Sequence, residues 1–261
     1  VLALGFTLWA ALRDRDPSIM HKSRNFYGVL TVYDYYPEDP GSRYRLLQHG
    51  RITHGLQFTA PDRANTPVSY YGPESGIGLG VNALPAGQRR IGVGGLGTGT
   101  MAAFARAGDS VRFYEINPQV QTVANAWFSY LPKCLGKVEV ALGDARLSME
   151  QEPPQRFDLL VLDAFSSDAI PVHLLTREAF EVYARHLSTN GLIAVHISNH
   201  YLDLEPVVVN LARTLTGDGA TNLVLLGTDA NGDALSFQTH TVPTRGEDPV
   251  DSLIGPEPVV R

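Results

Sequence analysis

The stretch that decides the fold is Arg90-Ile-Gly-Val-Gly-Gly-Leu-Gly-Thr-Gly-Thr100, a short apolar run that leads into a glycine-rich loop. Glycine lets the backbone turn sharply and come close to a ligand. We expect a helix over Thr98–Ala107, and its first turn would offer free backbone N–H groups. A strand, a glycine-rich loop and a helix in this order predict the first unit of a nucleotide-binding α/β domain.

Strands and helices alternate along the chain after this loop. The predicted strands are 111–116, 138–141, 157–162, 192–197, 222–226 and 235–239, and the predicted helices are 119–130, 176–187 and 206–215. This alternation is typical of a mostly parallel sheet that is covered by helices on both faces.

The residues before the loop follow a different pattern. Runs rich in aromatic and β-branched residues at 26–35, 44–48 and 52–59, with a Pro- and Gly-containing turn at 37–41, predict a small β meander. The expected division of the chain is a leader or membrane-helix end at 1–23, a β domain at 24–67, a larger α/β domain at 68–245 and a frayed tail at 246–261.

Composition narrows the class of function. With 44% hydrophobic and 18% charged residues in a chain of 261, the sequence is that of a folded globular protein. The net charge of −6 argues against nucleic-acid binding and is compatible with a cationic substrate, or simply with solubility. The single cysteine, Cys134, excludes a disulfide framework and a cysteine-based zinc site.

The first residues leave two interpretations open. Residues 1–12 are almost wholly apolar and are followed by Arg13, Arg15, Lys22 and Arg24. They are either the end of a membrane helix with a cytoplasmic positive flank, or a short amphipathic or core helix. The expected location is therefore the cytoplasm, as a free protein or as one associated with the cytoplasmic side of a membrane.

Acidic residues stand at or just after the ends of three of the predicted strands. Glu115 stands 18 positions after Gly97, where an acidic side chain can accept hydrogen bonds from ribose hydroxyls. Asp144 follows the next strand and is placed to bind the exocyclic amine of an adenine, although its Gly-Asp sequence is also a common turn. Asp163 and Asp168 follow the strand at 157–162; they either hold a cationic amine and help to remove its proton, or cap the next helix.

With these residues in place, the chain resembles the spermidine synthase family of aminopropyltransferases over residues 24–200, and in particular its variants fused to membrane segments. The runs Phe157-Asp-Leu-Leu-Val-Leu-Asp163 and Leu174-Leu-Thr-Arg-Glu-Ala-Phe180 match the family's strand, acidic loop and helix. The resemblance implies a Rossmann-like domain of the class I S-adenosylmethionine-dependent methyltransferase fold behind a small N-terminal β domain.

The same resemblance implies roles for individual residues. Asp163 and Tyr71 would be catalytic, and Tyr70 and Glu74 would bind the substrate amine. Position alone adds Asp168 to the catalytic residues, because it follows the same strand as Asp163, and adds His173 to the substrate-binding ones, because it lies just after the acidic loop. The donor would lie against Gly94, Gly95, Gly97, Gly99, Glu115, Asp144, Ala145 and Gln57. The co-substrate would be decarboxylated S-adenosylmethionine or S-adenosylmethionine, without a metal. The expected partners are a small amine and further copies of the chain, with no nucleic acid.

Two departures from the family keep other functions open. The family's donor-binding Asp in the glycine-rich loop falls on Gly97, and its second acidic-loop Asp falls on Ser166, two residues before Asp168. The first hypothesis is aminopropyl transfer to a di- or polyamine. The second is a methyltransferase that acts on a small amine, which the residue at 97 favours. The third is a non-catalytic domain that senses a nucleoside.

The histidines divide into two groups. His49 and His54 either line the cleft between the two domains or are turn residues. His196, His200 and His240 show no metal-ligand spacing, so we assign no metal.

Overall fold

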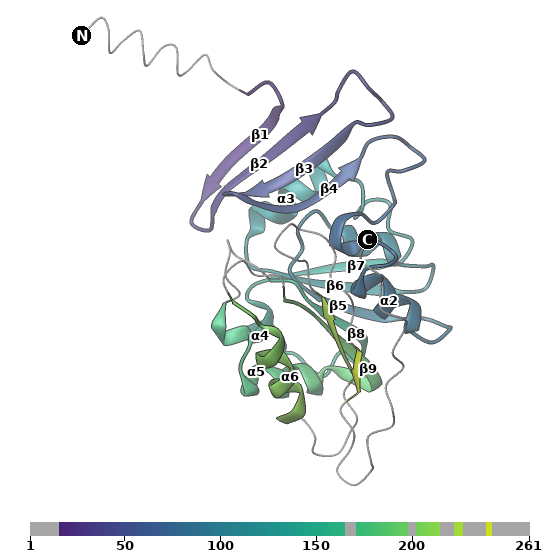
Figure 1. The fold of residues 1–261 in the computed structure, drawn as a ribbon, viewed down its shortest axis with the longest axis vertical. Helices are drawn as coiled ribbons and strands as arrows, with labels where there is room; N and C mark the ends of the chain where they lie inside the picture. Colours follow the sequence, from purple (N-terminus) through teal and green to yellow (C-terminus); the bar gives the residue numbers. More distant parts are fainter. Residues whose placement is uncertain (1–15, 165–170, 198–201, 215–221, 227–238, 242–261) are drawn as a thin grey trace, which may run out of the picture.

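The computed structural model describes residues 16–164, 171–197, 202–214, 222–226 and 239–241. Its first part is an antiparallel sheet in the order β1-β2-β3-β4, drawn in purple and blue in Figure 1. The strands are β1 (Ile19–Asn25), β2 (Gly28–Tyr35), β3 (Tyr44–His49) and β4 (Ile52–Phe58). The sequence patterns missed β1, because this edge strand alternates between exposed and half-buried residues and buries none completely.

The second sheet has seven strands in the order β11-β10-β9-β8-β5-β6-β7. All neighbours from β10 to β7 are parallel, and only β11 is antiparallel to its neighbour β10. The strands are β5 (Arg90–Gly94), β6 (Ser110–Glu115), β7 (Lys137–Leu142), β8 (Phe157–Leu162), β9 (Leu187–His196), β10 (Asn222–Leu226) and β11 (Thr239–Thr241). The mostly parallel sheet is confirmed; the strand predicted at 235–239 lies almost wholly outside the described residues.

Helices begin where the sequence provides capping groups. The helices are η1 (Ser69–Tyr71), α2 (Gly76–Ala83), η2 (Thr100–Phe104), α3 (Pro118–Trp127), α4 (Ala145–Gln151), η3 (Val172–Leu174), α5 (Arg177–Arg185) and α6 (Glu205–Thr214). The Asn117 side chain caps α3, which has a proline in its first turn, and Thr176 caps α5.

The segment that follows the glycine-rich loop differs from its predicted structure. The helix expected over 98–107 is only the short 3₁₀ helix η2, because Gly99 is left-handed before it and Ala105 is extended after it.

Within the described ranges, no helix is both long and apolar enough to cross a bilayer. Residues 1–12 lie outside those ranges.

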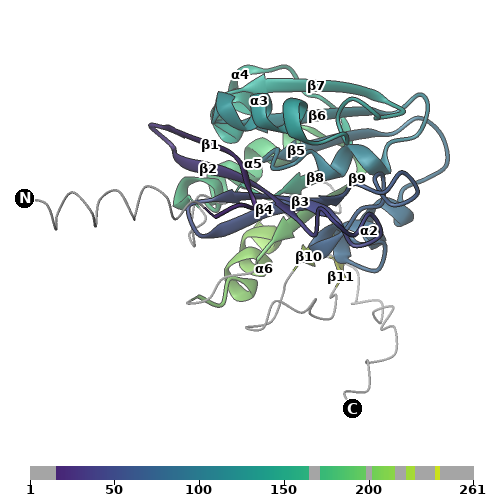
Figure 2. The same cartoon turned by 90° about the horizontal axis from the view of Figure 1, so that it is seen from above.

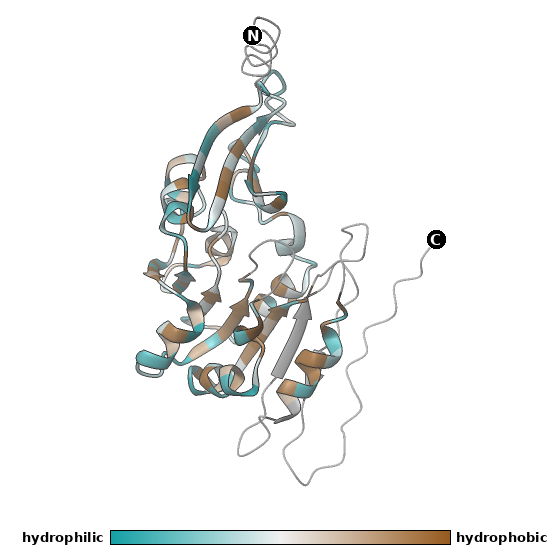
Figure 3. Cartoon of the chain, turned by 90° about the vertical axis from the view of Figure 1, so that its left-hand side faces the viewer, coloured by the Kyte–Doolittle hydropathy of each residue, from teal (hydrophilic) through white to brown (hydrophobic). Residues whose placement is uncertain are grey.

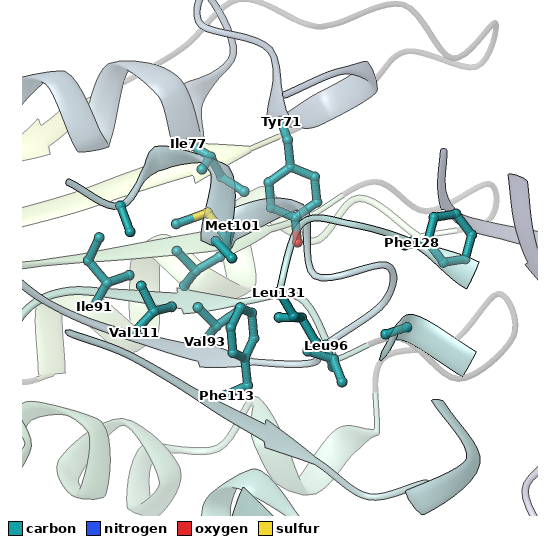
Figure 4. Close-up of a cluster of buried hydrophobic side chains, with 14 of the residues drawn as sticks. Tyr71, Ile77, Ile91, Val93, Leu96, Met101, Val111, Phe113, Phe128 and Leu131 are labelled. Atoms are coloured by element: carbon teal, nitrogen blue, oxygen red, sulfur yellow. The ribbon is translucent and has the colours of Figure 1, made fainter. Parts of the chain in front are cut away.

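Alternating side chains of the large sheet enter two separate cores. Ile91, Val93, Val111 and Phe113 point to one face, where they pack against α2, η2 and α3, as Figure 4 shows for the labelled residues. The opposite face packs against α4, α5 and α6. The period of two along each strand therefore produces a three-layer arrangement. Figure 2 shows from above the order of the strands across the large sheet, from β7 to β11.

The small sheet is joined to the first of these cores. Leu30, Val32 and Leu47 belong to the same buried cluster as Phe128 and Leu131, which follow α3. In Figure 3 brown apolar segments alternate with teal polar ones along β1–β4, as expected for a sheet that buries one face. This packing holds the small sheet over the large one, as seen in Figure 1.

Polar contacts fix the relative position of the two sheets. The Gln57 side chain donates from Nε2 to the Ala64 carbonyl and the Ser129 hydroxyl, and its Oε1 accepts from the Ser129 amide at 2.8 Å. Arg45 donates to the Trp127 carbonyl at 2.8 Å. Gln57 lies on β4 of the small sheet, whereas Ser129 follows α3, which packs on the large sheet. These bonds therefore tie β4 to the chain after α3.

Candidate active site

A cavity of about 330 Å³ lies between the small sheet and the carboxyl edge of the large one. Its floor is formed by the segments that follow β5, β6, β7 and β8, and Tyr27, His49 and His54 of the small sheet form its cover. Open α/β sheets bind ligands beyond the carboxyl ends of their strands, and a volume of about 300 Å³ or more suits a small molecule. The sequence patterns predicted this edge as the binding site.

The strand order sets the order of groups across the floor. Because the strands run β7-β6-β5-β8, Asp144, Glu115, Gly95 and Asp163 follow one another along the edge. Neighbouring strands lie about 4.8 Å apart. A nucleoside held at Asp144 and Glu115 would therefore extend its remaining substituent over the glycine-rich loop toward Asp163.

Glu115 ends β6 and is almost completely buried, with 8% of its surface exposed. Its Oε2 accepts from the Leu96 amide at 3.0 Å and its Oε1 from the Asn117 amide at 2.8 Å. Burial raises the pKa of this carboxyl, and the backbone hydrogen bonds act in the opposite direction. Each carboxylate oxygen has a further lone pair, so the group can still accept from two adjacent hydroxyls.

Asp144 has two partners of its own. Its Oδ1 accepts from the Leu147 amide at 2.9 Å and so caps α4, and its Oδ2 lies 2.7 Å from Nε2 of His173. His173 also lines the cavity but is about half exposed. The structure therefore brings Asp144, Ala145 and His173 together, with Asp144 serving as the helix cap that links them.

The glycine-rich loop passes close to other backbone segments. A Cβ at Gly95, where φ is +106°, would lie 2.3 Å from the Asp163 carbonyl oxygen. A Cβ at Gly97, where φ is +52°, would lie 2.6 Å from the His54 carbonyl oxygen of β4. The loop therefore has no room for a side chain at 97, and its backbone forms the cavity floor there.

Asp163 is held by three side chains. Its Oδ2 accepts from the hydroxyls of Tyr71 and, at 3.3 Å, Tyr70, and its Oδ1 lies 2.7 Å from Nδ1 of His196. Burial, followed by the charge of Asp163, raises the pKa of both tyrosines well above the ordinary value, so both phenols stay protonated and act as donors. The Tyr70 ring also packs on His196 with ring centres 4.5 Å apart.

Tyr70 and Tyr71 lie behind Asp163 rather than in the cavity wall. Asp163 lines the cavity, whereas neither tyrosine is among the residues that do. Their hydroxyls therefore orient the carboxylate and satisfy its lone pairs on the side away from the cavity.

The remaining predicted residues are spread more widely. Gly94 faces a smaller neighbouring cavity, and a Cβ at Gly99 would meet Leu131 at 2.7 Å. Glu74 is exposed in the turn before α2, and Gln57 is buried in the joint between the sheets; neither lines the cavity. Asp168 lies outside the described residues.

Sequence reasoning missed Tyr27 as a cavity residue and His196 as a partner of Asp163. His196 ends β9, and the register pairs Leu162 with Val195, so the next residue of each strand meets at the same edge. The signal for His196 was therefore its position at a strand end. Tyr27 carries no such signal, because the turn after β1 reaches the cavity only through the packing of the whole small sheet.

The residues of the cavity fit a cationic nucleoside derivative. Three carboxylates line it, those of Glu115, Asp144 and Asp163, and within the described chain no lysine or arginine does. Such an arrangement favours a positively charged ligand such as a sulfonium. No group of three or more potential metal ligands was found among the described residues.

These features define a class of protein: a Rossmann-like domain of the class I S-adenosylmethionine-dependent methyltransferase fold, joined to a small N-terminal β domain. The chain is 25% identical over 198 residues to a polyamine aminopropyltransferase from Vibrio vulnificus, a match covering 75% of this chain. It spans about 64% of the length of that relative. No protein-family model matches the chain.

Solved structures give the same fold. Spermidine synthase from Thermotoga maritima superposes with a TM-score of 0.58 and 11% identity, covering 87% of this chain and 74% of its own. A probable spermidine synthase from Corynebacterium glutamicum superposes with a TM-score of 0.53 and 22% identity, covering 66% and 62%. At these identities the two structures show that the chain shares their fold.

Proposed function

We propose that the protein transfers an aminopropyl group from decarboxylated S-adenosylmethionine to the amine of a di- or polyamine. The observation that carries the proposal is the charge of the cavity: three carboxylates stand at the ends of β7, β6 and β8, without a lysine or arginine among the described lining residues. Both substrates are cations, and decarboxylation removes the donor's only anionic group. The sequence similarity to a polyamine aminopropyltransferase supports the same reaction.

The geometry suggests a role for each group. Glu115 would accept hydrogen bonds from the ribose, and Asp144 from the adenine amine. The donor supplies a sulfonium: a C–N bond forms to the attacking amine as the C–S bond breaks, and the sulfur leaves as a neutral thioether. Because this reaction needs in-line placement more than acid catalysis, the main task of the chain is to position both substrates.

Asp163 would hold the acceptor amine and receive its proton. The hydroxyls of Tyr70 and Tyr71 and the ring of His196 fix the plane of this carboxylate. An oriented carboxylate beside the glycine-rich loop can place the amine nitrogen on the line of the breaking C–S bond. These three side chains are therefore positioning residues in the proposed mechanism, and Asp163 is the catalytic one.

An assay of transfer to putrescine tests the proposal. Asp163→Asn should lower the transfer rate at least a hundredfold while the affinity for methylthioadenosine, measured by titration calorimetry, stays within about twofold. Asp62→Asn, at an exposed loop position, is the matched control and should behave as the unmodified chain. Methyl transfer from intact S-adenosylmethionine to the amine, with no aminopropyl product, would contradict the proposal.

A further inference from the structure

The side chain of His54, on the covering sheet, lines the cavity and has no hydrogen-bond partner among the described residues. His54 is the extra residue of a β-bulge, because β3 and β4 pair Leu47 with Gly55 but Gln48 with Thr53. A bulge turns a side chain away from the direction that a regular strand would give it. Within the described chain, neither ring nitrogen of His54 has a hydrogen-bond partner, and its Nε2 is also out of contact with solvent. Buried polar groups without partners are uncommon, and this one belongs to a residue that lines the cavity.

The imidazole of His54 is uncharged at neutral pH. Burial lowers its pKa from the ordinary value of 6.5 to about 4, and the neighbouring ring of His49 acts in the same direction, with ring centres 5.3 Å apart. The charge of Asp163 opposes this shift only partly. His49 is itself engaged, since its Nε2 lies 2.7 Å from the Tyr27 carbonyl oxygen. His54 therefore offers a neutral nitrogen that can accept a hydrogen bond without repelling a cation.

The position of His54 matches one part of the donor. Its carbonyl oxygen touches Gly97, so the residue stands over the loop that follows β5. Along the edge this loop lies between Glu115 on β6 and Asp163 after β8. A donor whose ribose is at Glu115 would therefore hold its sulfur over this loop and beneath His54, and the three-carbon arm that begins at the sulfur would leave from there.

We propose that His54 binds the terminal ammonium of the donor's aminopropyl arm through a nitrogen of its imidazole ring. The inference rests on the proposed function, because it names the part of the donor that His54 recognises. Gly97 offers no side chain for this purpose and has no room for one. The neutral imidazole of His54 would take the place of an acidic side chain at position 97. The three carboxylates of the cavity would attract the cationic donor as a whole.

Calorimetric titration with two ligands tests the assignment. Decarboxylated S-adenosylmethionine carries the terminal ammonium, whereas methylthioadenosine has the same nucleoside and lacks the arm. His54→Ala should weaken the affinity for decarboxylated S-adenosylmethionine about tenfold to a hundredfold and leave that for methylthioadenosine within about twofold. His21→Ala, on β1 and outside the cavity, is the control and should change neither affinity.

Each outcome is decisive. Retained binding of methylthioadenosine shows that the His54 variant is folded, and His54→Gln, which keeps a hydrogen-bonding group, should recover part of the lost affinity. An equal loss for both ligands, or no loss, overturns the role of His54. A loss for intact S-adenosylmethionine alone would assign His54 to the donor's carboxylate and overturn the proposal. If the unmodified chain binds none of these nucleosides, it is the proposed function that fails.

Discussion

The Tyr71 hydroxyl is predicted to act on catalysis through Asp163 alone. The side chain is buried, so Tyr71→Phe keeps the packing and removes only the O–H group that the carboxylate accepts from. Hydrogen bonds to charged groups contribute about 1.5–3 kcal/mol, so kcat should fall roughly tenfold to a hundredfold. The affinity for methylthioadenosine should not change, since Tyr71 does not line the cavity.

The matched control is Tyr130→Phe, which removes another buried hydroxyl, one that donates to the carbonyls of Leu56 and Thr66. This variant should lose stability but keep its kcat. If the two substitutions reduce kcat equally, the Tyr71 hydroxyl has only a structural role.

His54 also gives stability a dependence on pH. Its folded pKa is about 4 and its ordinary value is 6.5, so between these values the unfolded chain binds more protons at this site than the folded one. The free energy of unfolding therefore falls as the pH is lowered through this window, by up to about 3 kcal/mol from His54 alone. Urea unfolding of the unmodified chain and of His54→Gln, at pH 7.5 and at pH about 4.5, measures this difference. Two curves that run parallel in pH would contradict the prediction.

Residue positions at strand ends were the part of the site that the sequence could predict. Glu115 ends a strand, and Asp144 and Asp163 each follow one, and parallel strands bring their carboxyl ends to one edge. Gln57 is different: it was matched by its place before the loop, but its hydrogen bonds join the two sheets. Which face of a small antiparallel sheet meets the cavity depends on packing between segments distant in sequence, and Tyr27 was missed for that reason.

At the scale of elements, β4 and the glycine-rich loop depend on each other. Gly97→Ala would place a Cβ in a left-handed conformation and 2.6 Å from the His54 carbonyl oxygen. The conformational cost is about 1–2 kcal/mol, and the contact with β4 adds to it. We expect a loss of more than 2 kcal/mol of unfolding free energy by urea titration, together with weaker methylthioadenosine binding, because the cavity lies between these two elements.

Gly50→Ala separates the two contributions. Gly50 has a similar φ of +61°, but nothing lies within 4 Å of the position of an added Cβ. It should therefore show the conformational cost alone and leave methylthioadenosine affinity unchanged. Equal losses of stability in the two variants would mean that the backbone of β4 moves away from residue 97 without cost.

Element types were predicted best where burial is strongest. Strand β8 buries five of its six residues and reads as a continuous apolar run, whereas β1 buries none. The short helix α2 was not predicted, since three of its eight residues are glycines and helix propensity is low there. Its helical form comes from packing: Ile77 and Val81 enter the core on the same face as Ile91 and Val93.

At the scale of the whole molecule, the two sheets should unfold as one unit. The small sheet shares its apolar cluster with the segment after α3. Gln57 bonds to Ser129 in that segment, and Arg45 bonds to the last residue of α3. Without this contact the apolar face of the four-stranded sheet would be exposed to water. Trp127 lies at the joint, where the Arg45 guanidinium is 5.8 Å from its ring centre, so its fluorescence reports on the contact.

In a Trp9→Phe background, Trp127 is the remaining tryptophan of the two in the sequence. Its fluorescence and the far-ultraviolet circular dichroism should then give the same urea midpoint, because loss of the joint and loss of the large sheet are one transition. Gln57→Ala leaves the Ser129 amide and the Ala64 carbonyl without their partner and should lower this shared midpoint, by about 1–3 kcal/mol in unfolding free energy. A fluorescence transition at lower urea than the dichroism transition would show instead that the small sheet detaches first. In that case the cavity would lose its cover, and with it His54, while the strands that carry Glu115 and Asp163 were still folded.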